Sequence, residues 1–117
     1  MSATVAGAPY TSALCIAYTS GNNVEIEAET TTAGATLTYP YISLWLNRTS
    51  LTTGTFSLDS TQLNNYAEYI TSVSTFKLAK SGSITITSIS PDVVGTFSFT
   101  CTDSTVVTNG KFVAESL

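Results

Sequence analysis

Apolar and polar residues alternate one by one in the clearest segments of this chain, and this alternation limits the possible folds more than any other feature. Residues 24–29 read Val-Glu-Ile-Glu-Ala-Glu, and the same period of two recurs in residues 83–87 and 97–101. Successive side chains of a β-strand point to opposite faces, so the pattern predicts strands with one buried face. The β-favouring residues Thr, Val, Ile, Tyr and Phe dominate these segments. We therefore expect an all-β fold.

Turn-forming residues separate the strand-like segments at short intervals. They occur at residues 20–23, 33–34, 53–54, 81–82, 90–92 and 103–104. The segments between them predict an antiparallel β-sandwich or flattened barrel of about eight to ten strands, with little or no helix. Residues 59–69 are the one segment in which we expect a helical turn to be tolerated. The sequence contains no linker or internal repeat, so residues 1–117 are expected to form a single domain.

The phase of the alternation predicts which side chains face the core. Residues 105–115 are expected to form one long final strand with a bulge at Gly110, because the phase changes there. A second phase change, between Leu37 and Tyr39 on one side and Ile42 on the other, predicts a bulge or edge position at Pro40. The expected core consists of Leu14, Ile16, Val24, Ile26, Ile42, Leu44, Leu46, Ile84, Ile86, Phe97, Phe99 and Phe112.

The two cysteines fall on different phases. With Leu14 and Ile16 assigned to the core, Cys15 points the other way, whereas Cys101 shares the core phase of Phe97 and Phe99. A disulfide needs both sulfur atoms in one layer. We expect two buried, reduced cysteines that act as small apolar residues, with a disulfide as the less favoured alternative.

The charge balance and the absence of His exclude several classes of function. Four Lys and Arg against eight Asp and Glu give a net charge of −4, and so few cations cannot neutralise a nucleic-acid backbone. Without His the chain cannot form a Ser-His-Asp or Cys-His catalytic site or a histidine-ligated zinc site. Ser74 and Lys77 match the Ser-x-x-Lys pattern of serine acyl-enzymes, but in a strand the two side chains point apart. We expect no enzyme activity, no cofactor and no metal site.

Three glutamates, Glu25, Glu27 and Glu29, share one face of an expected strand, and successive side chains on that face are about 7 Å apart. A calcium ion takes about six to eight oxygen ligands, and one straight strand cannot surround it. We interpret the three carboxylates as the solvated face of an edge strand, which discourages aggregation between sheets.

The N-terminal segment has no leader pattern. Residues 1–18 contain no basic residue, and the longest apolar run there has six residues. No stretch approaches the ~18 apolar residues of a membrane-spanning helix. We expect either a mature protein whose leader has been removed or a protein that is never exported.

A candidate binding site follows from the phase of residues 41–48. With Ile42 and Leu44 inside, Tyr41 and Trp45 must face outward, and Arg48 follows at the end of the strand. A lone tryptophan on a hydroxyl-rich face often marks contact with a partner. The sequence predicts a binding site of Trp45, Tyr41 and Arg48 for a protein neighbour or a glycan surface. The alternative is that both faces of this strand are covered and Trp45 belongs to a core.

The order of several segments resembles a family of small β-rich envelope proteins from Bacteroidetes-type bacteria. The resemblance rests on the Ala-Thr-Val-x-Gly opener at residues 3–7, Ile-Ser-Leu-Trp-Leu at 42–46, Gly-Thr-Phe-Ser-Leu at 54–58, Gly-Thr-Phe-Ser-Phe at 95–99 and Asn-Gly-Lys-Phe at 109–112. Members of that family are mostly predicted lipoproteins that face the periplasm or the exterior, and they have no assigned reaction. The chain departs from the pattern at Ala6 and Ala8, where Asp and Lys are usual, and at Cys101, where a small residue is usual.

Two functions remain open from the sequence. The resemblance implies a non-catalytic extracytoplasmic domain, in the cell envelope or extracellular, that acts as a binding or structural accessory. The absent leader favours the alternative, a non-exported assembly subunit such as a virion decoration or capsid-associated protein. Either function is compatible with an oligomer or a larger assembly.

Overall fold

The computed structural model describes residues 1–29, 38–61 and 63–116, and these residues contain ten strands and no helix. The all-β prediction and the predicted number of strands are confirmed. No helix in the described residues is long and apolar enough to cross a membrane. The strands are β1 (Ser2–Val5), β2 (Ala8–Thr11), β3 (Leu14–Ser20), β4 (Asn23–Glu29), β5 (Tyr41–Leu46), β6 (Gly54–Asp59), β7 (Tyr66–Ser72), β8 (Thr75–Ser88), β9 (Val93–Cys101) and β10 (Val106–Ser116).

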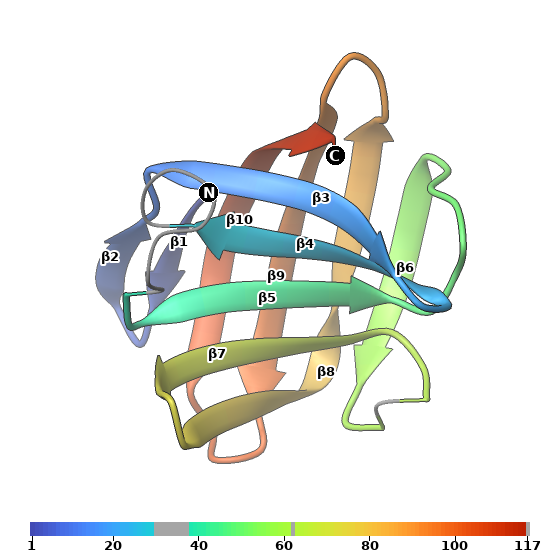
Figure 1. Cartoon of the computed structure of the whole chain (residues 1–117). Coiled ribbons are helices and arrows are strands. Elements are labelled where there is room, and N and C mark those ends of the chain that lie inside the picture. Colours follow the sequence, from blue (N-terminus) through green and yellow to red (C-terminus); the bar gives the residue numbers. More distant parts are fainter. Residues whose placement is uncertain (30–37, 62, 117) are drawn as a thin grey trace.

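Seven of these strands close into a barrel in the order β3-β4-β5-β7-β8-β9-β10. Each neighbouring pair is antiparallel except β10 and β3, which close the ring by a short parallel pairing of Glu115 with Ile16. The barrel is flattened into two layers: β3, β4, β5 and β7 form the first layer and run crosswise over β8, β9 and β10 of the second (Figure 1). The predicted flattened barrel is therefore correct.

Three further strands widen the second layer. The β1–β2 hairpin pairs with β10 through β1, and β6 pairs with β8. The second layer therefore extends beyond the ring on both sides, with β2 and β6 as its outer strands.

Strand β8 belongs to both layers and forms a corner of the barrel. Its first part pairs with β7, where Leu78 lies opposite Glu68, and its last part pairs with β9 and β6. The register with β9 shifts between Ala79 and Ser81, and Gly82 follows with a φ of 140°. Bulges and bends of this kind let one strand pass between two crossed layers.

The core lies between the two layers and contains ten of the twelve predicted residues. Phe97 stacks on Phe99 and Phe112, with ring centroids 6.1 and 6.3 Å apart. Aromatic pairs at such distances add to the stabilisation that burial provides. The confirmed core residues, each 4 % exposed or less, are Val24, Ile26, Ile42, Leu44, Leu46, Ile84, Ile86, Phe97, Phe99 and Phe112.

The prediction for β3 is wrong, because its phase is reversed. Leu14 is 40 % exposed and Ile16 is half-buried, whereas Cys15 and Ala17 are buried. Cys15 pairs with Ala28 of β4, whose side chain faces the core, and residues directly opposite in a sheet share a face. The register with β4 thus turns the small residues of β3 inward.

The reversed phase also corrects the placement of the cysteines. Cys15 of β3 and Cys101 of β9 both point into the one hydrophobic core, so the prediction that Cys15 points away from the core is wrong. Both are buried free thiols, as expected.

We expect the thiols of the native protein to react slowly, because burial raises the pKa of Cys15 and of Cys101 to about 11. The reactive thiolate is therefore scarce near pH 8. Titration with a disulfide reagent should detect little thiol in the native protein and two thiols per chain after unfolding without reductant. Recovery of no thiol from the unfolded chain would show that the two cysteines pair.

Two other local predictions are corrected. Pro40 lies in a bend just before β5 and not in a bulged strand, and Leu37 lies outside the described residues. No helix forms in the described part of residues 59–69, where the Asn64 amide donates one turn hydrogen bond to Thr61 O at 3.3 Å. Instead the Asp59 carboxylate accepts hydrogen bonds from the Thr61 amide at 2.8 Å and from Asn64 Nδ2 at 2.9 Å. Asp side chains bonded to the backbone two residues later favour turns over helices.

The final strand is as predicted. Strand β10 runs from Val106 to Ser116 in one piece, and its register with β9 shifts between Val107 and Gly110. Asn109 within the bulge has a φ of 53°, a conformation that Asn tolerates better than most residues. After the bulge, Lys111, Val113 and Glu115 point outward and are exposed.

Candidate functional site

The predicted site residues Trp45 and Tyr41 lie on the outer face of the first layer. Trp45 pairs with Glu25 of β4 and with Tyr66 of β7, and its ring stacks on that of Tyr66 at 5.4 Å and 9°. Trp45 is half-buried, and its Nε1 has no hydrogen-bond partner among the described residues. Tyr41 and Ser43 are buried, so the outer face of β5 is covered at these two positions.

The third predicted residue, Arg48, is held by neighbours near the end of β5. Its guanidinium carbon lies 4.1 Å from the ring centroid of Phe56, and Nη1 donates to Thr52 Oγ1 at 3.1 Å. A guanidinium over an aromatic face is attracted by the negative face of the ring. Trp45 and Tyr41 thus share one face, whereas Arg48 is anchored to Phe56 of β6.

The glutamates of β4 are not solvated, and the edge-strand interpretation is wrong. Strand β4 lies between β3 and β5, and Glu25 and Glu27 are only 5 % and 8 % exposed. The Tyr18 hydroxyl donates to Glu25 Oε2 at 2.6 Å and lies 3.1 Å from Glu27 Oε2, while Ser43 Oγ donates to Glu25 Oε1 at 2.7 Å. Buried carboxylates require such donors. The side chain of Glu29 lies outside the described part of the chain.

The tyrosines near these carboxylates are held in the neutral form. Burial, and then the charge of Glu27, raises the pKa of Tyr41 to about 12. Burial, and then the charge of Glu68, raises the pKa of Tyr66 to about 12. Burial and the hydrogen bond to Glu25 raise the pKa of Tyr18 as well. These phenols therefore stay neutral at neutral pH, and the Tyr18 hydroxyl donates to Glu25 on the outer face of the first layer.

We expect the protein to unfold as the buried phenols ionise. A group whose pKa is higher in the folded state contributes stability below its unfolded pKa and loses it as the pH rises. For Tyr10, Tyr41 and Tyr66, this stability is lost as the pH rises from about 10 to about 12. Absorbance of phenolate near 295 nm should therefore rise late and together with the loss of the β-sheet circular dichroism signal. Ionisation of all six tyrosines near pH 10 with an intact β-sheet signal would contradict this expectation.

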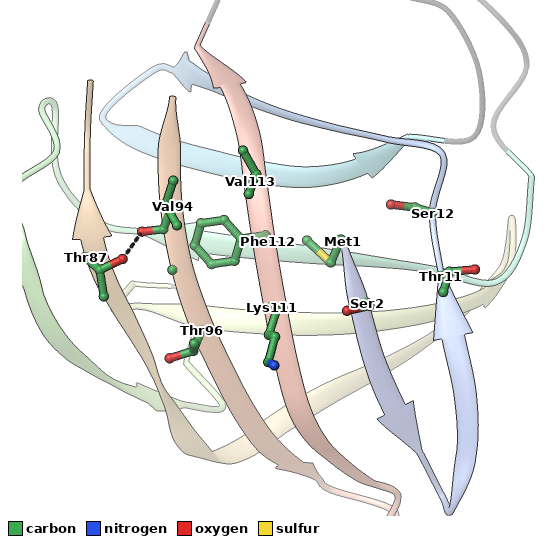
Figure 2. A pocket seen from close by; sticks show the side chains of 11 residues that line it. Met1, Ser2, Thr11, Ser12, Thr87, Val94, Thr96, Lys111, Phe112 and Val113 are labelled. Atoms are coloured by element: carbon green, nitrogen blue, oxygen red, sulfur yellow. Dashed lines mark hydrogen bonds between the residues drawn. The ribbon is translucent and has the colours of Figure 1, made fainter. Parts of the chain in front are cut away.

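An open hollow lies on the opposite side of the barrel from Trp45, on the outer face of the second layer. It lies between the β1–β2 hairpin and strands β8–β10 (Figure 2). Its volume is about 570 Å³. We call it the hairpin groove. Met1, Val94 and Val113 give it apolar lining, and Thr96 and Lys111 add a hydroxyl and an ammonium group. Pockets of this size, with apolar walls and a few polar groups, are typical of ligand sites.

A second hollow of about 370 Å³ adjoins the hairpin groove. It shares Met1 and Val113 with the groove and is also lined by Asp92 and Glu115. Val113 therefore lies between the two hollows, and it is 61 % exposed. The sequence analysis did not identify the exposed surface around Val113. The alternation in the last strand does indicate it, because Val113 is an apolar residue at an outward-facing position.

The described residues contain no group of three or more His, Cys, Asp or Glu side chains that could hold a metal ion. Ser74 lies in the turn before β8, and Lys77 is engaged elsewhere. Lys77 Nζ forms a salt bridge with Asp103 Oδ2 at 3.1 Å and donates to Thr105 Oγ1 at 3.1 Å. Hydrogen bonds from Thr105 and Lys77 lower the pKa of Asp103 to about 2. Lys77 thus connects β8 to the turn between β9 and β10.

Comparison with known proteins places the chain in a family. No curated protein and no solved structure matches it. One family model, described as Domain of unknown function (DUF6252), matches residues 1–114 and so covers nearly the whole chain. The chain therefore belongs to the DUF6252 family.

Proposed function

We propose that this chain is a non-catalytic accessory domain of the cell envelope or the extracellular space, and that it contacts a neighbouring protein through the second layer. The resemblance to small β-rich envelope proteins supports the location. The outer face of β9 and β10, with its two adjoining hollows, supports the contact surface.

Val113 is the observation that carries this proposal. Its side chain is 61 % exposed and lies beside Met1 and Val94, so an apolar surface is left open to water between two hollows. Apolar surface grouped in this way marks contact sites more often than scattered apolar residues do. A sugar would normally be bound by an exposed aromatic ring, but the aromatic residue that lines the groove, Phe112, is 2 % exposed and packs in the core. A protein partner is therefore favoured at this face.

Site-specific photo-crosslinking in the native host tests the contact. A photoreactive residue at position 113 should give one discrete protein product, and the same residue at position 106 should not. Val106 is the matched control because it lies on the same strand and is 44 % exposed. A crosslink to a polysaccharide would show that the partner is a glycan and not a protein. Equal crosslinking at both positions, or none at either, would refute the contact.

Fractionation of the native protein tests the location. Recovery in the envelope or the medium is the expected result. Recovery in purified particles would instead indicate the assembly subunit that the sequence left open.

Trp45, Tyr41 and Arg48 remain a second candidate contact, for a glycan. The observation that favours it is the half-buried ring of Trp45, which stacks on the buried ring of Tyr66 at 5.4 Å. A partly exposed aromatic ring offers a glycan an apolar face to pack against.

Fluorescence tests this candidate, because Trp45 is the single tryptophan of the chain. A contact residue should be quenched by acrylamide, and a bound glycan should protect it and shift its emission maximum. A blue-shifted emission that resists quenching in the isolated protein would remove the candidate.

A further inference from the structure

We propose that the partner contacted by the β9–β10 face is a second copy of this chain, related to the first by a two-fold axis near Val113. This inference rests on the proposed function, since it names the partner of the same face.

The order of side chains along β10 carries the inference. Lys111, Val113 and Glu115 point outward at alternate positions, while Phe112 and Ala114 are 2 % and 0 % exposed and point into the core. Successive outward positions of a strand are about 7 Å apart. The exposed row therefore presents a cation, an apolar group and an anion at even spacing.

Such a row is complementary to itself when a second copy runs in the opposite direction. A two-fold interface brings the same patch of both copies together, so that residue i meets j and j meets i. With the axis beside Val113, the two Val113 side chains pack against each other. Lys111 of each copy then meets Glu115 of the other, which gives two equivalent ion pairs.

The neighbouring strand extends the same pattern. Thr96 of β9 lies opposite Lys111 and adds no charge at that end of the row. Asp92 lines the same hollow as Glu115, so the negative end carries two carboxylates. Figure 2 shows the side chains of Val94 and Thr96 next to those of β10. The charge pattern is thus set by β10 and by the loop that precedes β9.

This pattern also selects one arrangement of the two copies. A copy stacked in the same direction would place Lys111 on Lys111 and the carboxylates of Asp92 and Glu115 on each other. Like charges across an interface disfavour the wrong arrangement, and opposite charges fix the register. The chain has a net charge of −4 and four Lys and Arg residues, so two copies repel each other overall. Lys111 beside the apolar patch offsets this repulsion at the interface and allows a second copy to approach.

Charge reversal provides the test, by sedimentation of the purified protein over a range of concentrations. The wild-type protein should form a dimer of twice the 12.3 kDa chain mass. Lys111→Glu and Glu115→Lys should each weaken the dimer about ten- to a hundredfold, because two attractions become two repulsions. An equal mixture of these two variants should form heterodimers. The Lys111→Glu variant carries carboxylates at positions 111 and 115, and the Glu115→Lys variant carries ammonium groups at both positions, so opposite charges meet at both places. The double variant should regain self-association.

Matched controls separate the face from general charge effects. Lys80→Glu reverses an exposed lysine of β8 outside this face and should leave the dimer unchanged. Val113→Asp should abolish the dimer, whereas Val106→Asp on the same strand should not. Circular dichroism should show that every variant keeps the β-sheet signal.

The outcomes are distinct from those of the crosslinking experiment. A wild-type protein that stays monomeric at the highest concentrations, or a dimer that is insensitive to both charge reversals, overturns the second-copy partner. If position 113 nevertheless crosslinks to a different protein in the host, the contact function stands without it. If position 113 crosslinks to nothing, the proposed contact itself fails.

Discussion

Replacing Gly82 by Ala should lower the free energy of unfolding by about 3–6 kcal/mol, because two unfavourable effects combine at this position. Gly82 has a φ of +140°, a backbone conformation that residues with a side chain rarely adopt. An added Cβ would also meet the carbonyl oxygen of Ser98 and lie 2.6 Å from the Cα of Phe99. The neighbouring strand is backbone that cannot move aside easily. Urea unfolding followed by circular dichroism measures the loss.

Gly21 supplies the control for this prediction. It also has a positive φ, +61°, but an added Cβ there would meet nothing within 4 Å. Gly21→Ala should therefore cost only the conformational strain of about 1–2 kcal/mol. If both substitutions cost the same, the close approach of β8 and β9 at Gly82 would not contribute to stability.

Gly82 also shows what the sequence could and could not predict. The pair Ser81-Gly82 predicts a turn between two strands, whereas the structure has one continuous strand, β8, that bends there and passes from one layer to the other. Glycine marks both a turn and a bend, and the local sequence does not distinguish them. The choice depends on how β8 pairs with β6, β7 and β9, and a local pattern carries no information about that pairing.

The core was predictable where large apolar residues alternate with polar ones, as in β4, the last part of β8 and β9. Strand β3 failed because its larger apolar residues, Leu14 and Ile16, alternate with the smaller Cys15 and Ala17. Side-chain size alone predicts that Leu14 and Ile16 face the core. Cys15 pairs with Ala28, whose side chain lies in the core, and this pairing with β4 decides which face of β3 points inward.

The outer face of the first layer was the hardest part to predict. Alternating glutamates usually indicate a solvated face, but Glu25 receives hydrogen bonds from Tyr18 and from Ser43, which is 18 residues away. Sequence cannot show that distant donors converge on one carboxylate. The outward phase of Trp45 was deduced from Ile42 and Leu44, which are indeed fully buried, because that step needs only the alternation within one strand.

Replacing Phe97 by Ala should lower the free energy of unfolding by about 3–5 kcal/mol, the usual cost of truncating a buried aromatic residue. Phe97 is 4 % exposed and stacks on both Phe99 and Phe112. Its ring also fills the space above Gly110, where an added Cβ would lie 2.5 Å from Cδ2 of Phe97. Truncation therefore removes two ring contacts and leaves a cavity beside the β10 bulge. For a domain whose total stability is about 5–15 kcal/mol, this loss moves the protein close to unfolding.

Phe76 provides a matched control on the same measurement. It is 57 % exposed at the start of β8, so Phe76→Ala removes the same atoms from the surface and should change the free energy of unfolding by about 0.5 kcal/mol or less. A second comparison locates the effect of Phe97. Gly110 has no side chain to fill the space that Phe97→Ala opens, so Phe97→Leu should recover about half of the lost stability by restoring apolar volume. Equal losses for Phe97→Ala and Phe76→Ala would show that Phe97 does not pack at the centre of the core as described.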